Sequence, residues 1–352
     1  MKAHGGVVFE HVTKRYGDVT AVDDVSFEVR PGQLVTLLGP SGCGKTTTLR
    51  MVAGLEPVTS GRIAIGGNDV THRAANERDV SMVFQSYALF PHMSVLDNVC
   101  YGPVSMGMGK DKARELARSK LAMLGLKGLE ARLPSELSGG QQQRVAVARS
   151  LVLEPAVLLF DEPLSNLDAK LRRRVRQEIR ELQQSLDLTV IYVTHDQEEA
   201  LAVSDQVIVM DGGRIAQQGT PAQLYESPAS RFLADFIGDA NLVSGELVRN
   251  GAGAEFSAGN VGVRVQADGV ATGPATLAVR PHRLRLVGAG EGVLPAECLR
   301  AAYLGSRMEY VLATPWGELL VFDQDVRKPI ARGDRAGVAF SPDDVIVLAG
   351  TA

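Results

Sequence analysis

The sequence predicts an α/β domain with an inserted helical subdomain, followed by a small all-β domain. In the first two-thirds of the 352 residues, short β-branched runs alternate with helical patterns, which indicates a sheet covered by helices. Between Ser86 and Pro134 helical segments interrupt this rhythm, which predicts a helical subdomain at about residues 86–152. Beyond Asn241, short strands separated by turn signals indicate a barrel-like β-domain.

The two domains are expected to divide near Gly238, after the amphipathic segment SRFLADFI, into residues 1–238 and 239–352. The strands predicted for the first domain are VVFEHV, SFEV, LVTLL, GRIAI, VSMVF, AVLLF, TVIYV and QVIVM. Those predicted for the second include GVRVQA, TLAVRP, MEYVLAT, ELLVF and DRAGVAF. From Asn241 onward 11 Lys and Arg are balanced by 12 Asp and Glu, so this domain is expected to pack and dock rather than to bind oligonucleotides.

Composition limits the classes of function that the chain can have. It is 45% hydrophobic and 22% charged, which allows a buried core, and its apolar runs are far shorter than the roughly twenty residues of a membrane helix. The beginning MKAHGGVVFE lacks the apolar segment of a signal peptide, so we expect a soluble protein whose membrane association depends on a partner. The scattered Cys43, Cys100 and Cys298 argue against a disulfide framework or a zinc site and favour a reducing cytosol. A formal charge of −4 does not indicate the basic surface that nucleic-acid binding requires.

The segment GPSGCGKTT lies between the apolar run LVTLL and the helical pattern LRMVAGL, which is the context that a phosphate-binding P-loop requires. Its glycines let backbone N–H groups close on phosphate oxygens, and the helix N-terminus adds a favourable dipole. Lys45 is expected to neutralise phosphate charge, and the Thr46 hydroxyl to bind Mg²⁺. The nucleotide contacts predicted here are Gly39, Pro40, Ser41, Gly42, Cys43, Gly44, Lys45, Thr46 and Thr47.

The segment PAVLLFDEP is a predicted buried strand that ends in two carboxylates, Asp161 and Glu162. Because adjacent side chains of a strand point in opposite directions, the two cannot have the same partner. Asp161 is the expected ligand of Mg²⁺ beside the P-loop, and Glu162 is expected to polarise or deprotonate a water aimed at the γ-phosphate.

Two further strand ends carry polar residues with more than one interpretation. His195 follows TVIYVT and would be either a structural histidine or a contact of the γ-phosphate and the attacking water. Gln85 follows VSMVF and is either a polar strand terminus or an amide ligand for Mg²⁺ or water. The segment LSGGQQQR predicts a helix start capped by Ser138, but a cap alone does not account for Gly139 and Gly140.

The helical pattern after Asn166 has one apolar stripe. Its members recur at spacings of three and four and are Leu167, Leu171, Val175, Ile179, Leu182 and Leu186. Four arginines mostly lie off this stripe, and we interpret them as a solvated face rather than as nucleic-acid contacts: Arg172, Arg173, Arg174 and Arg176.

Together these residues resemble the ATP-binding subunits of ABC transporters over essentially the whole chain. The family's motifs are matched, in order, by Walker A at Gly39–Thr47, the Q-loop at Gln85, the signature at Leu137–Gln141, Walker B ending in Asp161 and Glu162, the D-loop at Ser165–Asp168 and the switch histidine His195. The resemblance also implies that Tyr16 stacks against adenine. It implies head-to-tail pairing of two copies, in which Ser138, Gly139, Gly140 and Gln141 complete the ATP site of the partner.

The resemblance further implies two separate permease subunits, contacted through the helical subdomain at the cytoplasmic face of the inner membrane, and indirectly an extracytoplasmic solute-binding protein. Phrases such as YALFPHMSVLDNV and the tail with LAVRPHRLRL are similar to importers of ferric iron, polyamines, sulfate, phosphonate and sugars, and the ferric-iron or polyamine group is favoured. The tail departs from the family at His282, where an acidic residue is more frequent. Two alternatives stay open: a soluble ABC ATPase acting on DNA or ribosomes, and a C-terminal domain that senses a ligand or regulator.

Overall fold

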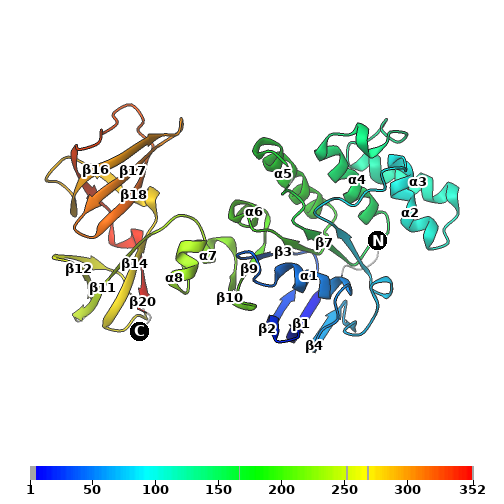
Figure 1. Ribbon diagram of the computed structural model, residues 1–352, viewed down its shortest axis with the longest axis horizontal. Helices are drawn as coiled ribbons and strands as arrows, with labels where there is room; N and C mark the ends of the chain where they lie inside the picture. Colours follow the sequence, from blue (N-terminus) through cyan, green and yellow to red (C-terminus); the bar gives the residue numbers. More distant parts are fainter. Residues whose placement is uncertain (1–4, 166, 251–252, 268, 351–352) are drawn as a thin grey trace. The chain divides into compact units, whose positions relative to one another are not determined.

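The computed structural model divides the chain into two compact units, Met1–Pro221 and Ala222–Ala352 (Figure 1). It describes residues 5–165, 167–250, 253–267 and 269–350. The D-loop residue Asn166 therefore lies outside the described residues. The first unit is α/β and the second has two antiparallel sheets, which confirms the predicted fold class. No helix in the described part of the chain is long and apolar enough to span a membrane.

The central sheet of the first unit has the strand order β10-β9-β3-β8-β7-β6. Its strands are β3 (Leu34–Leu38), β6 (Val80–Val83), β7 (Val157–Asp161), β8 (Val190–Val193), β9 (Gln206–Asp211) and β10 (Arg214–Gly219). All neighbours pair in parallel except β9 and β10. Strands β3, β7 and β8 are buried along their whole length, as expected for parallel strands covered on both faces.

A second, antiparallel sheet in the same unit has the order β2-β1-β4-β5. Its strands are β1 (Val7–Tyr16), β2 (Val19–Val29), β4 (Ser60–Ile65) and β5 (Asn68–Asp69). Helix α1 (Lys45–Ala53) shares one apolar core with this sheet and with one face of the central sheet. The helix that follows the P-loop is therefore fixed from two sides.

Helices α5 (Ala169–Ser185), α6 (Gln197–Val203) and α4 (Gly139–Leu151) share a core with the other face of the central sheet. The predicted stripe of α5 is confirmed, because Val175 and Ile179 are buried in this core. The opposite side of α4 packs with α2 (Val95–Ser105) and α3 (Lys110–Met123) in a separate apolar cluster. Figure 1 shows these three helices gathered to one side of the sheet.

The second unit places two five-stranded sheets around one core that contains Trp316. One sheet is β13-β12-β11-β14-β20, with β11 (Asn241–Asn250), β12 (Gly253–Ala258), β13 (Val261–Val265), β14 (Gly273–Val279) and β20 (Val345–Ala349). The other is β15-β19-β16-β17-β18, with β15 (Arg285–Val287), β16 (Leu294–Tyr303), β17 (Met308–Thr314), β18 (Gly317–Asp323) and β19 (Arg335–Ala339). Two short helices come before them, α7 (Pro221–Glu226) and α8 (Arg231–Phe236).

Arg280, which follows β14, holds these two helices against the β-domain. Its side chain is almost fully buried, and its guanidinium Nη1 donates to the carbonyl oxygens of Ala234 (2.8 Å), Gly238 (3.1 Å) and Asp239 (3.2 Å). Nη2 donates to the carbonyl oxygen of Tyr225 (2.9 Å), whose ring lies 4.2 Å below the guanidinium carbon. Arg280 thus satisfies carbonyl groups that the ends of two helices would otherwise leave without donors.

We expect Arg280→Met to destabilise the second unit by about 3 kcal/mol, because it strips donors from several buried carbonyl groups. Trp316 is the single tryptophan of the chain and lies in the core of this unit, so its fluorescence in a urea titration reports the unfolding directly. Arg327→Met is the matched control, since Arg327 is mostly exposed and its bonds within the described residues are with nearby Asp325. Equal midpoints for the two variants would contradict the role given to Arg280.

Candidate functional site

The carboxyl ends of four parallel strands lie at one edge of the central sheet. The P-loop Gly39–Thr47 follows β3, Asp161 ends β7 and is followed by Glu162, His195 comes soon after β8, and Gln85 comes soon after β6. Because these strands are neighbours and run in the same direction, the sheet brings together residues that are far apart in sequence.

The P-loop takes a backbone path that only glycine follows without strain. Gly44 has φ 99° and caps α1, and a Cβ there would lie 2.4 Å from the carbonyl oxygen of Ala21. Gly42 has φ 81°, also in the left-handed region. The loop therefore turns directly into the N-terminus of α1, where free N–H groups and the helix dipole favour an anion.

Lys45, the first residue of α1, directs its ammonium back over this loop. Its Nζ donates to the carbonyl oxygens of Gly39 (2.7 Å) and Pro40 (2.8 Å) and lies 3.7 Å from Cys43 Sγ. Burial raises the pKa of the Cys43 thiol, with Lys45 opposing, so the sulfur adds no negative charge to the loop near neutral pH. The loop thus presents one positive charge and a row of backbone N–H groups.

The hydroxyl of Thr46 and the carboxylate of Asp161 meet beside the loop, with Thr46 Oγ1 3.3 Å from Asp161 Oδ1. Burial raises the pKa of Asp161, and the hydroxyl of Thr46 opposes that rise. These oxygens are the hard donors that Mg²⁺ takes. Within the described residues no group of three His, Cys, Asp or Glu side chains could hold a metal alone. One hydroxyl and one carboxylate are a donor set that suits Mg²⁺, which usually keeps several waters and binds substrate phosphates.

The carboxylate of Glu162 contacts His195. Its Oε2 lies 3.2 Å from His195 Nδ1, and its backbone carbonyl accepts a bond of 3.1 Å from the Ser165 hydroxyl. Gln85 Nε2 donates to the same hydroxyl at 3.2 Å. The φ of Glu162 is 45°, an uncommon left-handed conformation for a residue with a side chain. One connected set of bonds therefore joins the ends of β6, β7 and β8.

A buried acid behind His195 was missed by sequence reasoning. Glu199 accepts hydrogen bonds from the hydroxyls of Thr194 (2.8 Å) and Tyr192 (3.1 Å). Asp196 caps α6 by accepting from the backbone N–H of Glu199 at 3.1 Å. The spacing of Asp196 and Glu199 is that of a helix N-terminus and was the available signal, although here the glutamate turns back to the sheet. Arg172 ion-pairs with both acids, so its interpretation as part of a solvated face is wrong.

The signature segment caps the start of α4. Ser138 Oγ accepts from the backbone N–H of Gln141 at 3.4 Å, and the Ser138 N–H donates to Gln141 Oε1 at 2.9 Å, which is a capping box. In the described part of the chain no hydrogen bond joins these residues to Gly39–Thr47. Within one chain, the two glycine-containing segments are therefore separate features.

Tyr16 ends β1, and its ring is about half exposed. Lys14 Nζ lies 4.6 Å from the ring centre. Burial raises the pKa of Tyr16, Glu56 adds to the rise, and the hydroxyl of Thr47 opposes it. An accessible aromatic face thus lies close to the helix that begins at the P-loop.

The fold and this site define a P-loop ATPase of the ATP-binding cassette class, and the chain belongs to the ABC transporter family. The family model described as ABC transporter matches residues 22–165, and the one described as TOBE domain matches residues 277–348. The nucleotide of the site is therefore ATP.

Similarity to named proteins extends over nearly the whole chain. It is 57% identical over 349 residues to the Fe(3+) ions import ATP-binding protein FbpC 1 of Rhizobium meliloti, covering 99% of each chain. It is 60% identical over 323 residues to the Fe(3+) ions import ATP-binding protein FbpC of Agrobacterium fabrum, covering 92% of each.

Two solved structures resemble the first unit. One is a dimeric post-hydrolysis ATP-binding cassette bound to ADP and Pi, with 30% identity and a TM-score of 0.55 over 61% of this chain and 98% of that chain. The other is cbiO1 of Clostridium perfringens, part of an ABC transporter complex, with 30% identity and a TM-score of 0.58 over 62% of this chain and 89% of that chain.

Proposed function

We propose that the chain is the ATPase subunit that drives import of ferric ions through a separate membrane permease. The observation that carries this proposal is the whole-length similarity to Fe(3+) import ATP-binding proteins, of which the chain covers 99% in one case. Sequence reasoning favoured the ferric-iron and polyamine groups equally, and both named relatives above are ferric-ion import proteins.

The P-loop holds the phosphates in this proposal. Backbone N–H groups of Gly39–Gly44 and the N-terminus of α1 surround the phosphate oxygens, and Lys45 exchanges a carbonyl partner for a phosphate oxygen. Thr46, Asp161 and Gln85 supply oxygens for Mg²⁺, which when bound neutralises the charge that develops on the β- and γ-phosphates. Tyr16 stacks on the adenine.

Glu162 acts as the base of hydrolysis. Its carboxylate takes up a proton as a water attacks the γ-phosphate, and His195 keeps that carboxylate oriented through the 3.2 Å contact. Asp161 contacts Thr46 and Glu162 contacts His195, so the metal-binding oxygen and the base are separate groups.

Two copies pair head to tail, so that Ser138, Gly139, Gly140 and Gln141 of one chain complete the ATP site of the other. Ser138 is exposed and caps the N-terminus of α4, and a helix N-terminus is a suitable partner for a phosphate of the other chain's nucleotide. A dimeric relative that binds ADP and Pi supports this arrangement.

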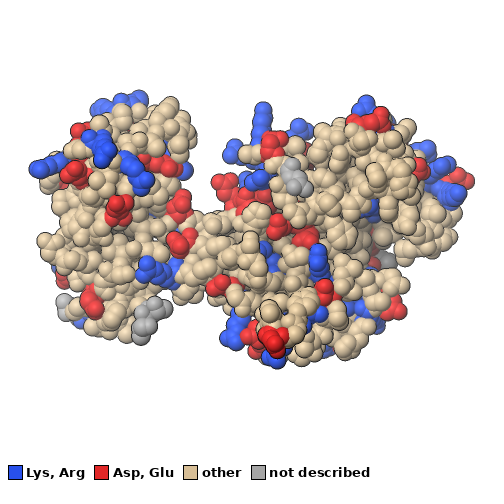
Figure 2. Space-filling model, in the orientation of Figure 1, with Lys and Arg blue, Asp and Glu red and all other residues tan. Residues whose placement is uncertain are grey.

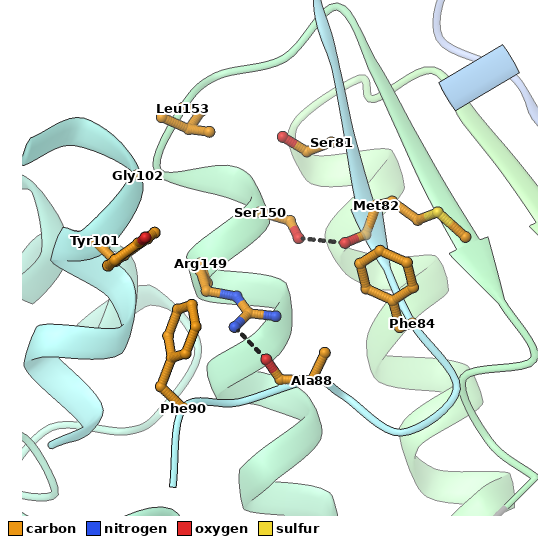
Figure 3. A pocket seen from close by; sticks show the side chains of 10 residues that line it. All are labelled: Ser81, Met82, Phe84, Ala88, Phe90, Tyr101, Gly102, Arg149, Ser150 and Leu153. Atoms are coloured by element: carbon orange, nitrogen blue, oxygen red, sulfur yellow. Dashed lines mark hydrogen bonds between the residues drawn. The ribbon is translucent and has the colours of Figure 1, made fainter. Parts of the chain in front are cut away.

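A permease segment docks in the hollow between β6 and the helices α2 and α4 (Figure 3). The hollow measures about 400 Å³ and is mainly apolar, with Phe84, Phe90, Tyr101 and Leu153 among its lining residues. Arg149 also lines the hollow and donates to the carbonyl oxygens of Ala88 (2.6 Å) and Tyr87 (2.9 Å), as seen for Ala88 in Figure 3. Both residues have positive φ and follow Gln85 closely, so movement of the docked segment reaches the ATP site.

Charge on the surface favours transport over action on DNA or ribosomes. On the face drawn in Figure 2, basic and acidic side chains are interspersed and form no continuous basic field. Nucleic-acid binding draws most of its affinity from such a field. The chain is expected at the cytoplasmic face of the membrane, held by its permease, with a solute-binding protein on the other side.

The test is uptake of radiolabelled ferric ion by cells that lack the gene and are complemented with it. Wild-type protein should restore uptake of iron and co-purify with a membrane permease. Uptake of a polyamine or a sugar serves as the matched control and should not depend on the chain. Restored uptake of another solute, or co-purification with nucleic acid instead of a permease, would contradict the proposal.

A further inference from the structure

We propose that Arg172 is a positioning residue that couples the signature segment Ser138–Gln141, which serves the partner's ATP, to His195 in the chain's own site. The inference rests on the proposed ATPase with shared sites, and adds to it the residue through which one chain links its two half-sites.

Arg172 lies in the first turn of α5 and contacts three groups outside that helix. Its Nη1 donates to Asp196 Oδ2 at 3.2 Å, and its Nε lies 3.7 Å from Glu199 Oε1. Its Nη2 donates to the carbonyl oxygen of Leu167 at 3.2 Å. The first two contacts belong to the loop and helix that follow His195, and the third belongs to the D-loop.

The contacts on the His195 side are well fixed. Asp196 is the next residue after His195 and caps α6, and Glu199 is buried and bonded to Thr194 and Tyr192 of β8 and its end. Among the ion pairs of the described residues, Arg172 is the single cation within 4.0 Å of either acid. A displacement of Arg172 is therefore passed to the backbone on both sides of His195.

Leu167, whose carbonyl oxygen Arg172 contacts, packs in turn against the signature segment of the same chain. A Cβ placed on Gly139 would lie 3.2 Å from Leu167 Cδ2, and one placed on Gly140 would lie 3.2 Å from Leu171 Cδ1. The D-loop and the start of α5 therefore pack directly on the two glycines. When a nucleotide draws Ser138–Gln141 toward it, Leu167 and Leu171 must follow, and the guanidinium of Arg172 carries that shift to Asp196.

Stability alone gives little reason for an arginine at this position. A partly exposed ion pair contributes little to folding, and its burial costs desolvation. What an arginine adds is a planar fork that fixes several acceptors at once, which neither a lysine nor an apolar residue provides.

The experiment measures steady-state ATP turnover of the full chain in complex with its permease. Arg172→Met is expected to lower kcat roughly tenfold with KM for ATP within about twofold, since the P-loop is untouched. Arg172→Lys should recover part of the loss, because one charged contact survives. The matched control is Arg174→Met on the same helix, whose one ion pair is with Glu178 and which is 73% exposed; its kcat should equal that of wild type.

A second readout separates coupling from a structural role. Ser138→Ala and Arg172→Met should be non-additive, the double variant losing clearly less than the product of the two single losses, whereas Ser138→Ala with Arg174→Met should be multiplicative. Multiplicative losses in the first pair, or a folded Arg172→Met chain with wild-type kcat, would overturn the inference. If Arg172→Met fails to fold, the same comparison with Asp196→Asn, which removes the partner acid, decides it. A wild-type complex without ATP turnover would instead refute the proposed function.

Discussion

Glu162→Gln is expected to reduce steady-state ATP turnover by at least 10²-fold while leaving ATP binding unchanged, since a positioned general base contributes about 10² to 10⁴ to a rate. The amide keeps the shape of the side chain and its contact with His195, but it cannot take up a proton from water. The P-loop, Thr46 and Asp161 are untouched, so the affinity for nucleotide should stay within about twofold. Phosphate release at saturating ATP and equilibrium binding of labelled ATP measure the two quantities.

Glu198→Gln is the matched control for this substitution. Glu198 lies in the first turn of α6, a few residues after His195, and its side chain is exposed. The same change of charge close to the site should therefore leave turnover at the wild-type level. If turnover of Glu162→Gln stayed within threefold of wild type, Glu162 would not be the general base, and another group at this edge of the sheet would have that role.

The part of the site that the sequence could predict is the part that follows from strand direction. Asp161, Glu162 and His195 each come at or after a short apolar run, and carboxyl ends of parallel neighbours meet at one edge whatever the details of packing. The same holds for α5, whose apolar stripe alone determines which side faces the sheet.

The residues that the sequence did not reveal depend on packing between separate elements. Periodicity places Arg172 and Arg174 alike, off the apolar stripe of α5, but only one of them meets the acids of α6. In the sequence, Glu199 is one polar residue in a helical pattern. Its role depends on the two hydroxyl donors at the end of β8, which only the structure reveals. Such contacts are set by the geometry of neighbouring elements, which periodicity within one element does not contain.

Two strands that sequence reasoning did not name consist largely of small or polar residues. The strand β16 reads LPAECLRAAY and β12 reads GAEFSA, so neither has the β-branched run that identified β7 and β8. Only the end of β2, SFEV, was predicted; the preceding VTAVDDV is interrupted by two adjacent aspartates and is partly exposed. These strands are stabilised by pairing with neighbours rather than by their own composition.

If two chains share their ATP sites, the number of intact sites depends on whether two substitutions lie on the same chain or on different chains. Ser138→Arg blocks the signature segment with bulk and charge, and Lys45→Ala removes the positive charge of the P-loop. When the two are on different chains of a mixed dimer, one composite site carries both and the other carries neither. Differently tagged chains, purified through both tags in a Glu162→Gln background that prevents hydrolysis, should trap one ATP per dimer, whereas either homodimer should trap none.

The matched control places both substitutions on one chain and pairs it with a chain that carries neither. The composition of the dimer is unchanged, but the damaged P-loop now faces an intact signature segment and the damaged signature faces an intact P-loop. Each composite site is then damaged once, so no ATP should be trapped. If each chain formed its site alone, the outcome would be the reverse, because the unsubstituted chain would keep a complete site and the separated arrangement would have none. Nucleotide counts from these two dimers therefore distinguish a shared site from a self-contained one, and they do so without any knowledge of the solute.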